Sequence, residues 1–326
     1  MSLSRREFLL AIAAAASTDR DLMSRWKTIA RTTDDIVGIA AMHVGTGHLA
    51  TMNGDERFPL ASVCKVPIAM HILALVDEGK LLLDQDVEVL PRDVWSGVSD
   101  ISKRWPNPRK FRVGEMLELM VARSDNTAEE TLFRIGGGGS GITARLRRWK
   151  IDGVRVDRSE RQCALDANGV EHYPPPEQWT DAGIRRLIDA VPTAVRYKTT
   201  LKFLKDPRDT ATPKGTVAMF ARLFRGEFLS RSSTSYLIEI LKSTVSFPTR
   251  LKGALPPGTV VAHKTGSHQN LSTFTASTND SGVIFLPNGG LLAISVYLKA
   301  STRNDAVRDN VIAQAALAAF EKFKAD

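Results

Sequence analysis

Cysteines, long apolar runs and internal repeats are scarce or missing in this sequence. Its two cysteines, Cys64 and Cys163, allow at most one disulfide, and the sequence leaves open whether they lie close enough to bond. Neither the apolar stretch Phe8–Ala16 nor any later segment reaches the ~20 residues that a spanning helix needs, so no stable membrane insertion is expected. Low complexity is confined to Gly136–Gly139, which predicts a turn between helices.

The net charge is +8, from 44 Lys and Arg against 36 Asp and Glu, but the basic residues recur along most of the chain with acidic residues between them. No basic run is interleaved with stacking aromatic residues, so a nucleic-acid partner is not expected. With 326 residues, 43% of them hydrophobic, and 23 Gly and 15 Pro, the composition disfavours disordered, collagenous and coiled-coil classes. The length predicts about two domains or one large one.

The first residues are typical of a targeting segment. Arg5 and Arg6 precede the short apolar stretch Phe8–Ala16, which ends in small residues that a signal peptidase accepts. We therefore expect residues 1–18 to be a twin-arginine export signal and the mature protein to be periplasmic or extracellular. An amphipathic helix with a chance arginine pair is the alternative.

Strand patterns occupy both ends of the remaining chain. A helix is expected at Asp19–Arg31, followed by a hairpin formed by Ile36–Val44 and His48–Met52 around a glycine-containing turn. Near the other end the strand-like runs are Val260–Lys264, Leu271–Ala276, Val283–Leu286 and Leu291–Lys299. An amphipathic helix is expected at Arg303–Phe323, and apolar residues recur at helical spacing through most of the middle.

These patterns predict an α/β fold combined with an all-α part. A discontinuous antiparallel-sheet domain, 19–58 and 246–326, is expected to be flanked by the N- and C-terminal helices. A helical domain, 59–245, is expected to be inserted between its two halves.

The first motif with chemical meaning pairs Ser62 with Lys65 at the start of an apolar helix. Positions i and i+3 share a helix face, so the lysine amine can reach the serine hydroxyl, and a helix N-terminus favours a developing alkoxide. The pattern predicts a serine nucleophile with a built-in base. Taken alone, the pattern is more often a helix-capping serine followed by a surface lysine, so further motifs must decide.

The second motif is Ser124-Asp125-Asn126, in a loop between two expected helices. Such a loop can present polar side chains to a cleft, or its serine or aspartate can cap the next helix.

The third motif, Lys264-Thr265-Gly266-Ser267, lies on an expected strand. A strand edge can pair with an extended substrate amide, while Gly266 permits close approach and Lys264 supplies positive charge.

In this order the three motifs resemble those of class A β-lactamases and penicillin-binding proteins. The resemblance to class A β-lactamases covers nearly everything after residue 18, including the surroundings Arg57–Leu60 and Arg250–Gly253. Glu160, in the segment Asp157–Glu160, matches the glutamate that activates the deacylating water in that family. Penicillin-binding peptidases need no such glutamate.

The resemblance implies a role for each of these residues. Ser62 attacks the lactam carbonyl, and either Lys65 or Glu160 acting through a water removes its proton. Backbone N–H groups of Ser62 and Ser267 form the oxyanion hole, and Ser124 passes a proton to the lactam nitrogen. Substrate contacts are implied for Asn126, Lys264, Thr265, Gly266, Ser267 and Arg250.

Arg158 and Asp209 match the pair that clips the neck of the loop bearing the glutamate, here enlarged to 158–209. The insertion contains Tyr173–Pro176, expected to be stiff and extended, and a helical pattern at Asp181–Ala190. It is expected to form a lid or to decorate the surface.

Two departures fall on the deacylation machinery. Ala164 stands where the family has an asparagine that shares the hydrolytic water, and Asp166 or Asn168 could replace it. Glu130 stands where many members carry an asparagine that supports the loop, and an acid there could couple to Glu160.

The expected function is β-lactam hydrolysis by a monomer without cofactor. The six histidines form no ligand-spaced cluster, so no metal is expected. The alternatives are a D-alanyl-D-alanine peptidase and a β-lactam-binding protein that turns over slowly because deacylation fails.

Overall fold

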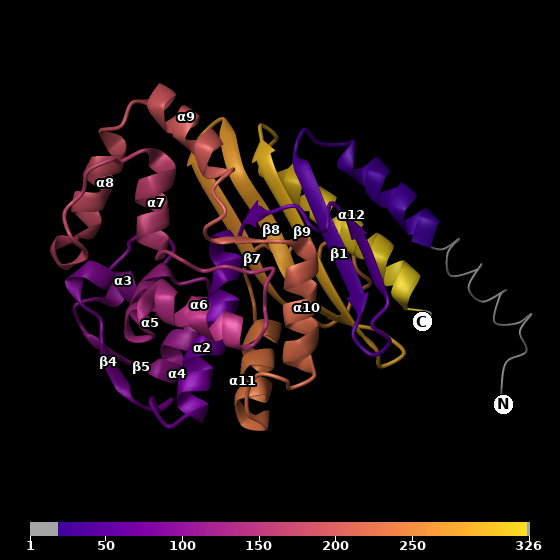
Figure 1. Ribbon diagram of the computed structural model, residues 1–326, viewed down its shortest axis with the longest axis horizontal. Helices are drawn as coiled ribbons and strands as arrows, with labels where there is room; N and C mark the ends of the chain where they lie inside the picture. Colours follow the sequence, from indigo (N-terminus) through magenta and orange to yellow (C-terminus); the bar gives the residue numbers. More distant parts are fainter. Residues whose placement is uncertain (1–18, 325–326) are drawn as a thin grey trace, which may run out of the picture.

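A computed structural model describes residues 19–324 (Figure 1). The expected export signal, residues 1–18, lies outside the described residues. The main element is a five-stranded antiparallel sheet in the order β2-β1-β9-β8-β7. Its strands are β1 (Ile36–His43), β2 (Leu49–Met52), β7 (Val261–Leu271), β8 (Phe274–Phe285) and β9 (Leu291–Ser301).

Helices cover both faces of the sheet (Figure 1). Successive side chains of β1 point to opposite faces of the sheet and therefore belong to different hydrophobic cores. Ile39 and Ala41 pack with α12 (Asp305–Phe323) and with the helix over 19–30. Ala40 belongs to the core on the opposite face. Trp26 fastens the first helix to α12 by donating from Nε1 to the carbonyl oxygen of Ala315 at 3.1 Å. The opposite face is covered by α10 (Pro213–Phe224).

The helical lobe lies beside the β7 edge and is built around the apolar helix α2 (Lys65–Asp77), which a 3₁₀ turn, η1 (Ala61–Cys64), precedes. Its other elements are α3 (Asp100–Arg104), α4 (Val113–Ala122), α5 (Asn126–Ile135), α6 (Gly138–Arg148), α11 (Arg231–Lys242), η2 (Pro91–Asp93) and the strand pairs β4 (Asp86–Glu88) with β5 (Lys110–Arg112) and β3 (Phe58–Pro59) with β6 (Thr210–Ala211). The predicted fold class, an antiparallel sheet with flanking helices and a helical part, is confirmed.

The strands near the C-terminus differ from the prediction. The expected strand Leu271–Ala276 spans the turn between β7 and β8, and Val283–Leu286 is only the end of the long strand β8. The middle of β8, Ser277–Gly282, is polar, yet it is buried because the side chains of residues 278–281 have hydrogen-bond partners inside the protein. Asp280 Oδ1 lies 2.8 Å from His263 Nδ1, for example, and Ser281 Oγ lies 2.8 Å from Ser295 Oγ.

The enlarged loop 158–209 is helical along most of its length. It contains α7 (Glu160–Asn168), η3 (Pro176–Gln178), α8 (Asp181–Asp189) and α9 (Thr193–Phe203), of which the sequence pattern indicated only α8. A small core of Leu165, Val170, Trp179 and Ile184 joins α7 to α8. The end of α9 packs on β7, where the Phe203 and His268 rings lie 5.1 Å apart. Among residues 19–324, no helix is both long and apolar enough to cross a membrane.

Candidate active site

Ser62 lies half-buried in the 3₁₀ turn η1, between the sheet and the helical lobe. Asn279, inside β8, donates to the carbonyl oxygens of Pro59 at 2.8 Å and Leu60 at 3.0 Å, which fixes the segment entering this turn. A Cβ atom on Gly266 would lie 3.1 Å from the backbone nitrogen of Ser62. Glycine at this position therefore lets strand β7 approach the Ser62 N–H closely.

Lys65 is fully buried, and its ammonium group meets the turn that leads into α5. Lys65 Nζ donates to the Ser124 carbonyl oxygen at 2.7 Å, to Ser124 Oγ at 3.1 Å and to Asn126 Oδ1 at 2.6 Å. Ser124 has a φ of 62°, a left-handed conformation that is costly for a residue other than glycine. Asp125 instead caps α5, accepting from the Ala128 N–H at 2.9 Å.

A second buried lysine reaches Ser124 from the sheet. Lys264 Nζ donates to Ser124 Oγ at 3.0 Å and to the Thr265 carbonyl oxygen at 2.9 Å. Burial, together with the positive charge of Lys65, lowers the pKa of Lys264 to about 7. Two lysines from different parts of the fold therefore converge on one serine hydroxyl.

Beside Lys264, the β7 edge carries the hydroxyls of Thr265 and Ser267. Thr265 Oγ1 lies 2.7 Å from Ser246 Oγ. Arg250 donates from Nη2 to Ser267 Oγ at 2.8 Å, and its Nε donates to Asp309 Oδ1 at 2.8 Å. Only 1% of Arg250 is exposed, so a solvated surface arginine is excluded and its charge lies directly behind Ser267.

Glu160 is the first residue of α7, a helix capped by Ser159. Burial raises the pKa of Glu160, while the positive charges of Lys65 and Lys264 oppose that shift. The structure therefore brings this carboxyl near both lysines. Asp209 fixes the neck of the loop: its Oδ2 accepts from Arg158 Nε at 2.6 Å and its Oδ1 from the Arg158 N–H at 2.9 Å.

Glu130 supports the other side of the same loop. Its Oε1 accepts from the Arg161 N–H at 2.7 Å, next to Glu160. Burial raises the pKa of Glu130 to about 8, against the attraction of the Arg161 guanidinium, and the neighbouring Glu129 adds to the rise. Of the two adjacent glutamates on α5, Glu129 is the one whose pKa is raised by the charge of Glu160.

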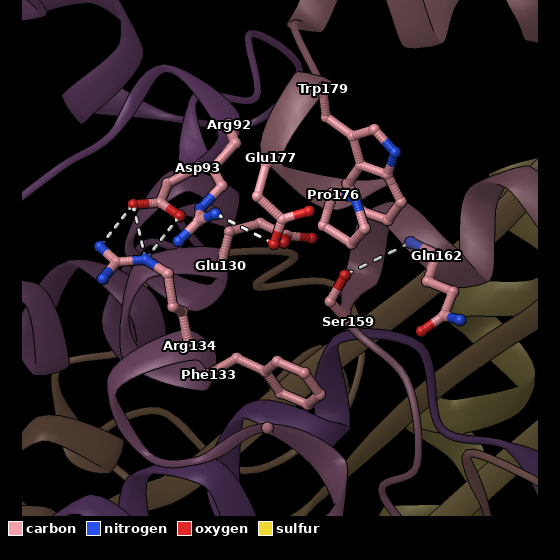
Figure 2. A pocket seen from close by; sticks show the side chains of 11 residues that line it. Arg92, Asp93, Glu130, Phe133, Arg134, Ser159, Gln162, Pro176, Glu177 and Trp179 are labelled. Carbon is pink, nitrogen blue, oxygen red and sulfur yellow. Dashed lines mark hydrogen bonds and ion pairs between the residues drawn. The ribbon is translucent and has the colours of Figure 1, made fainter. Parts of the chain in front are cut away.

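A cavity of about 270 Å³ flanks this support (Figure 2). Two ion pairs at its rim, Arg134–Asp93 at 2.6 Å and Arg92–Glu177 at 3.4 Å, lie among the side chains drawn there. The Arg92–Glu177 pair joins η2 of the helical lobe to η3 of the insertion, so these contacts hold the enlarged loop in place.

The two residues that could replace the missing asparagine are engaged elsewhere. Asp166 Oδ2 accepts from Arg158 Nη1 at 2.7 Å, and Asn168 Nδ2 donates to the Ala164 carbonyl oxygen at 2.8 Å. Among the described residues, neither hydrogen-bonds to Glu160. The interpretation that Asp166 or Asn168 takes the role of the asparagine is therefore not supported.

Sequence reasoning missed four polar residues of this site: the buried Glu129, Asn279 and Asp309 and the half-buried Ser246. Glu129 and Ser246 contact the motif residues Lys65 and Thr265, whereas Asn279 holds the segment before Ser62 and Asp309 holds Arg250. None of the four stands in a short motif of its own.

Both cysteines are free thiols, which answers the question of a disulfide. Within the part of the chain that the structure describes, no group of three or more His, Cys, Asp or Glu residues could hold a metal ion.

The sheet with its helical lobe, and the meeting of Lys65, Ser124 and Lys264 beside Ser62, define a serine hydrolase of the β-lactamase and penicillin-binding type. A model of the Beta-lactamase enzyme family matches residues 21–323. The chain belongs to that family and is a class A serine β-lactamase.

Individual relatives agree with this assignment. Beta-lactamase VEB-1 of Pseudomonas aeruginosa is 28% identical over 310 residues, which cover 95% of this chain and 92% of the relative. Extended-spectrum beta-lactamase PER-1 of the same organism is 30% identical over 287 residues, covering 87% and 82%. The crystal structure of a beta-lactamase from Chitinophaga pinensis has a TM-score of 0.77 and 29% identity, covering 92% of this chain and 98% of that one.

Proposed function

We propose that this class A β-lactamase opens β-lactam rings through an acyl-enzyme on Ser62, which a water activated by Glu160 then hydrolyses. The observation that carries the proposal is the convergence of two buried lysine ammonium groups on Ser124 Oγ, 3.1 Å from Lys65 and 3.0 Å from Lys264. A serine hydroxyl between two cations donates its proton readily, as protonation of the lactam nitrogen requires.

The acylation step uses the turn that bears Ser62. The Ser62 and Ser267 N–H groups would stabilise the oxyanion, and the small size of Gly266 supports this role because it lets β7 approach Ser62 N. When the C–N bond of the lactam breaks, the nitrogen takes the Ser124 proton. Asn126, which also holds Lys65, would bind the side-chain amide of the substrate.

The substrate carboxylate would bind at the β7 edge. Thr265 and Ser267 offer hydroxyls there, and Lys264 supplies the nearby charge. Arg250 would act mainly through Ser267, since its guanidinium is buried and already donates to Ser267 Oγ at 2.8 Å. Arg158 and Asp209 would keep the loop in place so that Glu160 faces the acyl-enzyme.

A slow-turnover β-lactam-binding protein is the second candidate. It is favoured by Ala164, because the asparagine that would share the hydrolytic water is missing and Asp166 and Asn168 have other partners. A D-alanyl-D-alanine peptidase shares the three motifs but needs no glutamate at the position of Glu160.

Export and oligomeric state belong to the same proposal. The arginine pair and apolar stretch within residues 1–18 support twin-arginine export to the periplasm or the extracellular space. We expect a monomer that needs no cofactor and binds no nucleic acid.

A time course of chromogenic cephalosporin hydrolysis by the mature protein tests the proposal, with Ser62→Ala as the control. Sustained turnover that the Ser62→Ala variant lacks is the expected result. A burst of about one equivalent followed by a stall would contradict efficient deacylation and favour the slow-turnover candidate. No burst and no turnover would overturn both.

A further inference from the structure

Glu129, which belongs to none of the three motifs, lies directly against the catalytic lysine. It stands on α5, one turn after Asn126, and only 1% of it is exposed. Its Oε2 lies 3.3 Å from Lys65 Nζ, and its Oε1 accepts from Cys64 Sγ at 3.3 Å. Burying a carboxyl with so few partners costs free energy unless an opposite charge pairs with it, and Lys65 is that partner.

The contacts of Lys65 indicate an ammonium group. Its three hydrogen bonds, two to Ser124 and one to Asn126, use all three N–H groups that a charged lysine has, and the Glu129 carboxyl lies beside them. Among the described residues, Lys65 makes no hydrogen bond to Ser62 or Glu160. The amine is therefore arranged to donate protons rather than to accept one.

We propose that Glu129 is a positioning residue that keeps Lys65 as an ammonium ion, so that Glu160, acting through a water, removes the proton of Ser62. This inference rests on the proposed function and answers, for this chain, which of the two bases acts in acylation. Glu129 touches neither substrate nor reacting atoms, and it acts only through Lys65 and Glu160.

The contact with Lys65 is what favours a charged Glu129. Burial raises the pKa of Glu129 and so disfavours its carboxylate, the positive charge of Lys65 at 3.3 Å opposes that rise, and Glu160 adds to it. A small cavity of about 20 Å³, enough for about one water molecule, is lined by Cys64, Glu129, Glu160 and Cys163. The charged and titratable groups that face Glu129 are Cys64, Lys65, Glu130, Glu160 and Lys264. Farther along the cavity wall lie Cys163, Arg158, Asp209 and His268.

The protons balance over one acylation. The Ser62 proton passes through a water to Glu160 as the Ser62 Oγ–C bond forms. The lactam C–N bond breaks, its nitrogen takes the Ser124 proton, and Lys65 replaces that proton. The proton held by Glu160 then restores the Lys65 ammonium, which leaves Glu160 ionised for deacylation.

Single-turnover acylation, followed by mass spectrometry from pH 4 to pH 9, tests the electrostatic part. Glu129→Gln removes a carboxyl that interacts with Glu160, so the acidic limb of the acylation profile should move to lower pH. Glu129→Asp keeps the charge and should restore the parent limb. A slower Glu129→Gln enzyme whose acidic limb does not move would overturn the proposal and leave Glu129 a packing role.

Glu160→Gln tests the assignment of the base. Its acylation rate should fall by about 10²-fold or more, because a general base has been removed. Acylation at the parent rate in this variant would overturn the proposal, even if deacylation were blocked.

A third experiment needs neither a folded Glu129 variant nor turnover. The Lys65 side chain of the parent protein is titrated by ¹⁵N NMR of labelled lysine, and the Lys65→Arg variant assigns its signal. We expect an ammonium signal at pH 7. A neutral amine at pH 7 would overturn this inference while leaving Ser62-dependent hydrolysis intact. Failure of the proposed function would instead appear as the absence of any adduct on Ser62.

Discussion

Lys264 Nζ donates a hydrogen bond of 3.0 Å to Ser124 Oγ, across 140 positions of the sequence. Lys264 comes from the sheet edge β7, and Ser124 from the turn before α5, so this bond joins the two parts of the molecule at the site. Because Ser124 Oγ also accepts from Lys65 at 3.1 Å, its own proton is available for donation to another group. The geometry couples Ser124, the proposed proton donor, to Lys264, the charge proposed to bind the substrate.

The charge on Lys264 should make substrate binding depend on pH. Burial and the neighbouring Lys65 lower the pKa of Lys264 to about 7, so its charge is lost as the pH rises above that value. We expect the KM for carboxylate-bearing β-lactams to rise between pH 6 and pH 9. Lys264→Arg keeps its charge throughout this range and should flatten the dependence.

Steady-state kinetics at several pH values check this prediction, with a β-lactam ester as the control substrate. The ester lacks the carboxylate and should show little change of KM. The same rise of KM in the parent and in Lys264→Arg would assign the effect to another group.

Glu130 should make the protein less stable at alkaline pH. Burial raises its pKa in the folded state to about 8, above the ordinary value of 4.5. A carboxyl whose pKa is higher in the folded than in the unfolded state stabilises the folded protein fully only below pH 4.5. That contribution to the unfolding free energy is lost as the pH rises through about 8. Glu130→Gln keeps an acceptor for the Arg161 N–H and removes the titratable group. The unfolding free energy of this variant should therefore fall less between pH 5 and pH 9 than that of the parent protein.

Denaturant unfolding at those two pH values measures the difference, and Glu115→Gln, at a partly exposed site on α4, is the matched control. Parallel losses in the parent and in Glu130→Gln would show that Glu130 does not carry the effect.

The Arg158–Asp209 pair should stabilise the loop 158–209 more than the contact of Arg158 with Asp206 does. Asp209 contacts Arg158 Nε at 2.6 Å and two backbone N–H groups, whereas Asp206 lies 3.5 Å from Arg158 Nη1. We expect Asp209→Asn to destabilise the protein by about 1–3 kcal/mol and to slow deacylation more than acylation. Asp206→Asn should destabilise the protein less and should slow deacylation less.

Thermal unfolding and burst kinetics of the two variants check this order. Equal effects of Asp206→Asn and Asp209→Asn would contradict it.

The sequence was sufficient for the outer parts of the fold, where local patterns decide the structure. The hairpin of β1 and β2 and the last helix were predicted to within a few residues, because alternation and helical periodicity continue up to a glycine-containing turn or a helix cap. Strand β8 was not, since Ser277–Gly282 is polar and is buried only because distant residues such as His263 and Ser295 supply its hydrogen bonds.

The site divides in the same way. Ser62, Lys65, Ser124 and Lys264 stand in short motifs, so their positions could be read from the sequence. Glu129 could not be recognised, because one acid on a mixed helix face looks like a solvated residue until the fold places Lys65 beside it. Helix α9 was missed because its packing depends on contacts with α7 and β7 rather than on a strong periodicity of its own.

Ala164 offers a direct test of how the hydrolytic water is held. Positions 160 and 164 are one turn apart on α7, so a side chain at 164 shares the face of Glu160. An asparagine amide there would give the water a second partner, and we expect Ala164→Asn to raise the deacylation rate several-fold without changing the acylation rate. Stopped-flow measurement of both steps separates them, with Ala164→Leu, of similar size but without an amide, as the control. If Ala164→Leu accelerates deacylation as much as Ala164→Asn, helix packing rather than water binding is responsible. If neither variant changes deacylation, Glu160 alone is sufficient to hold the water, and the alanine at position 164 does not limit turnover.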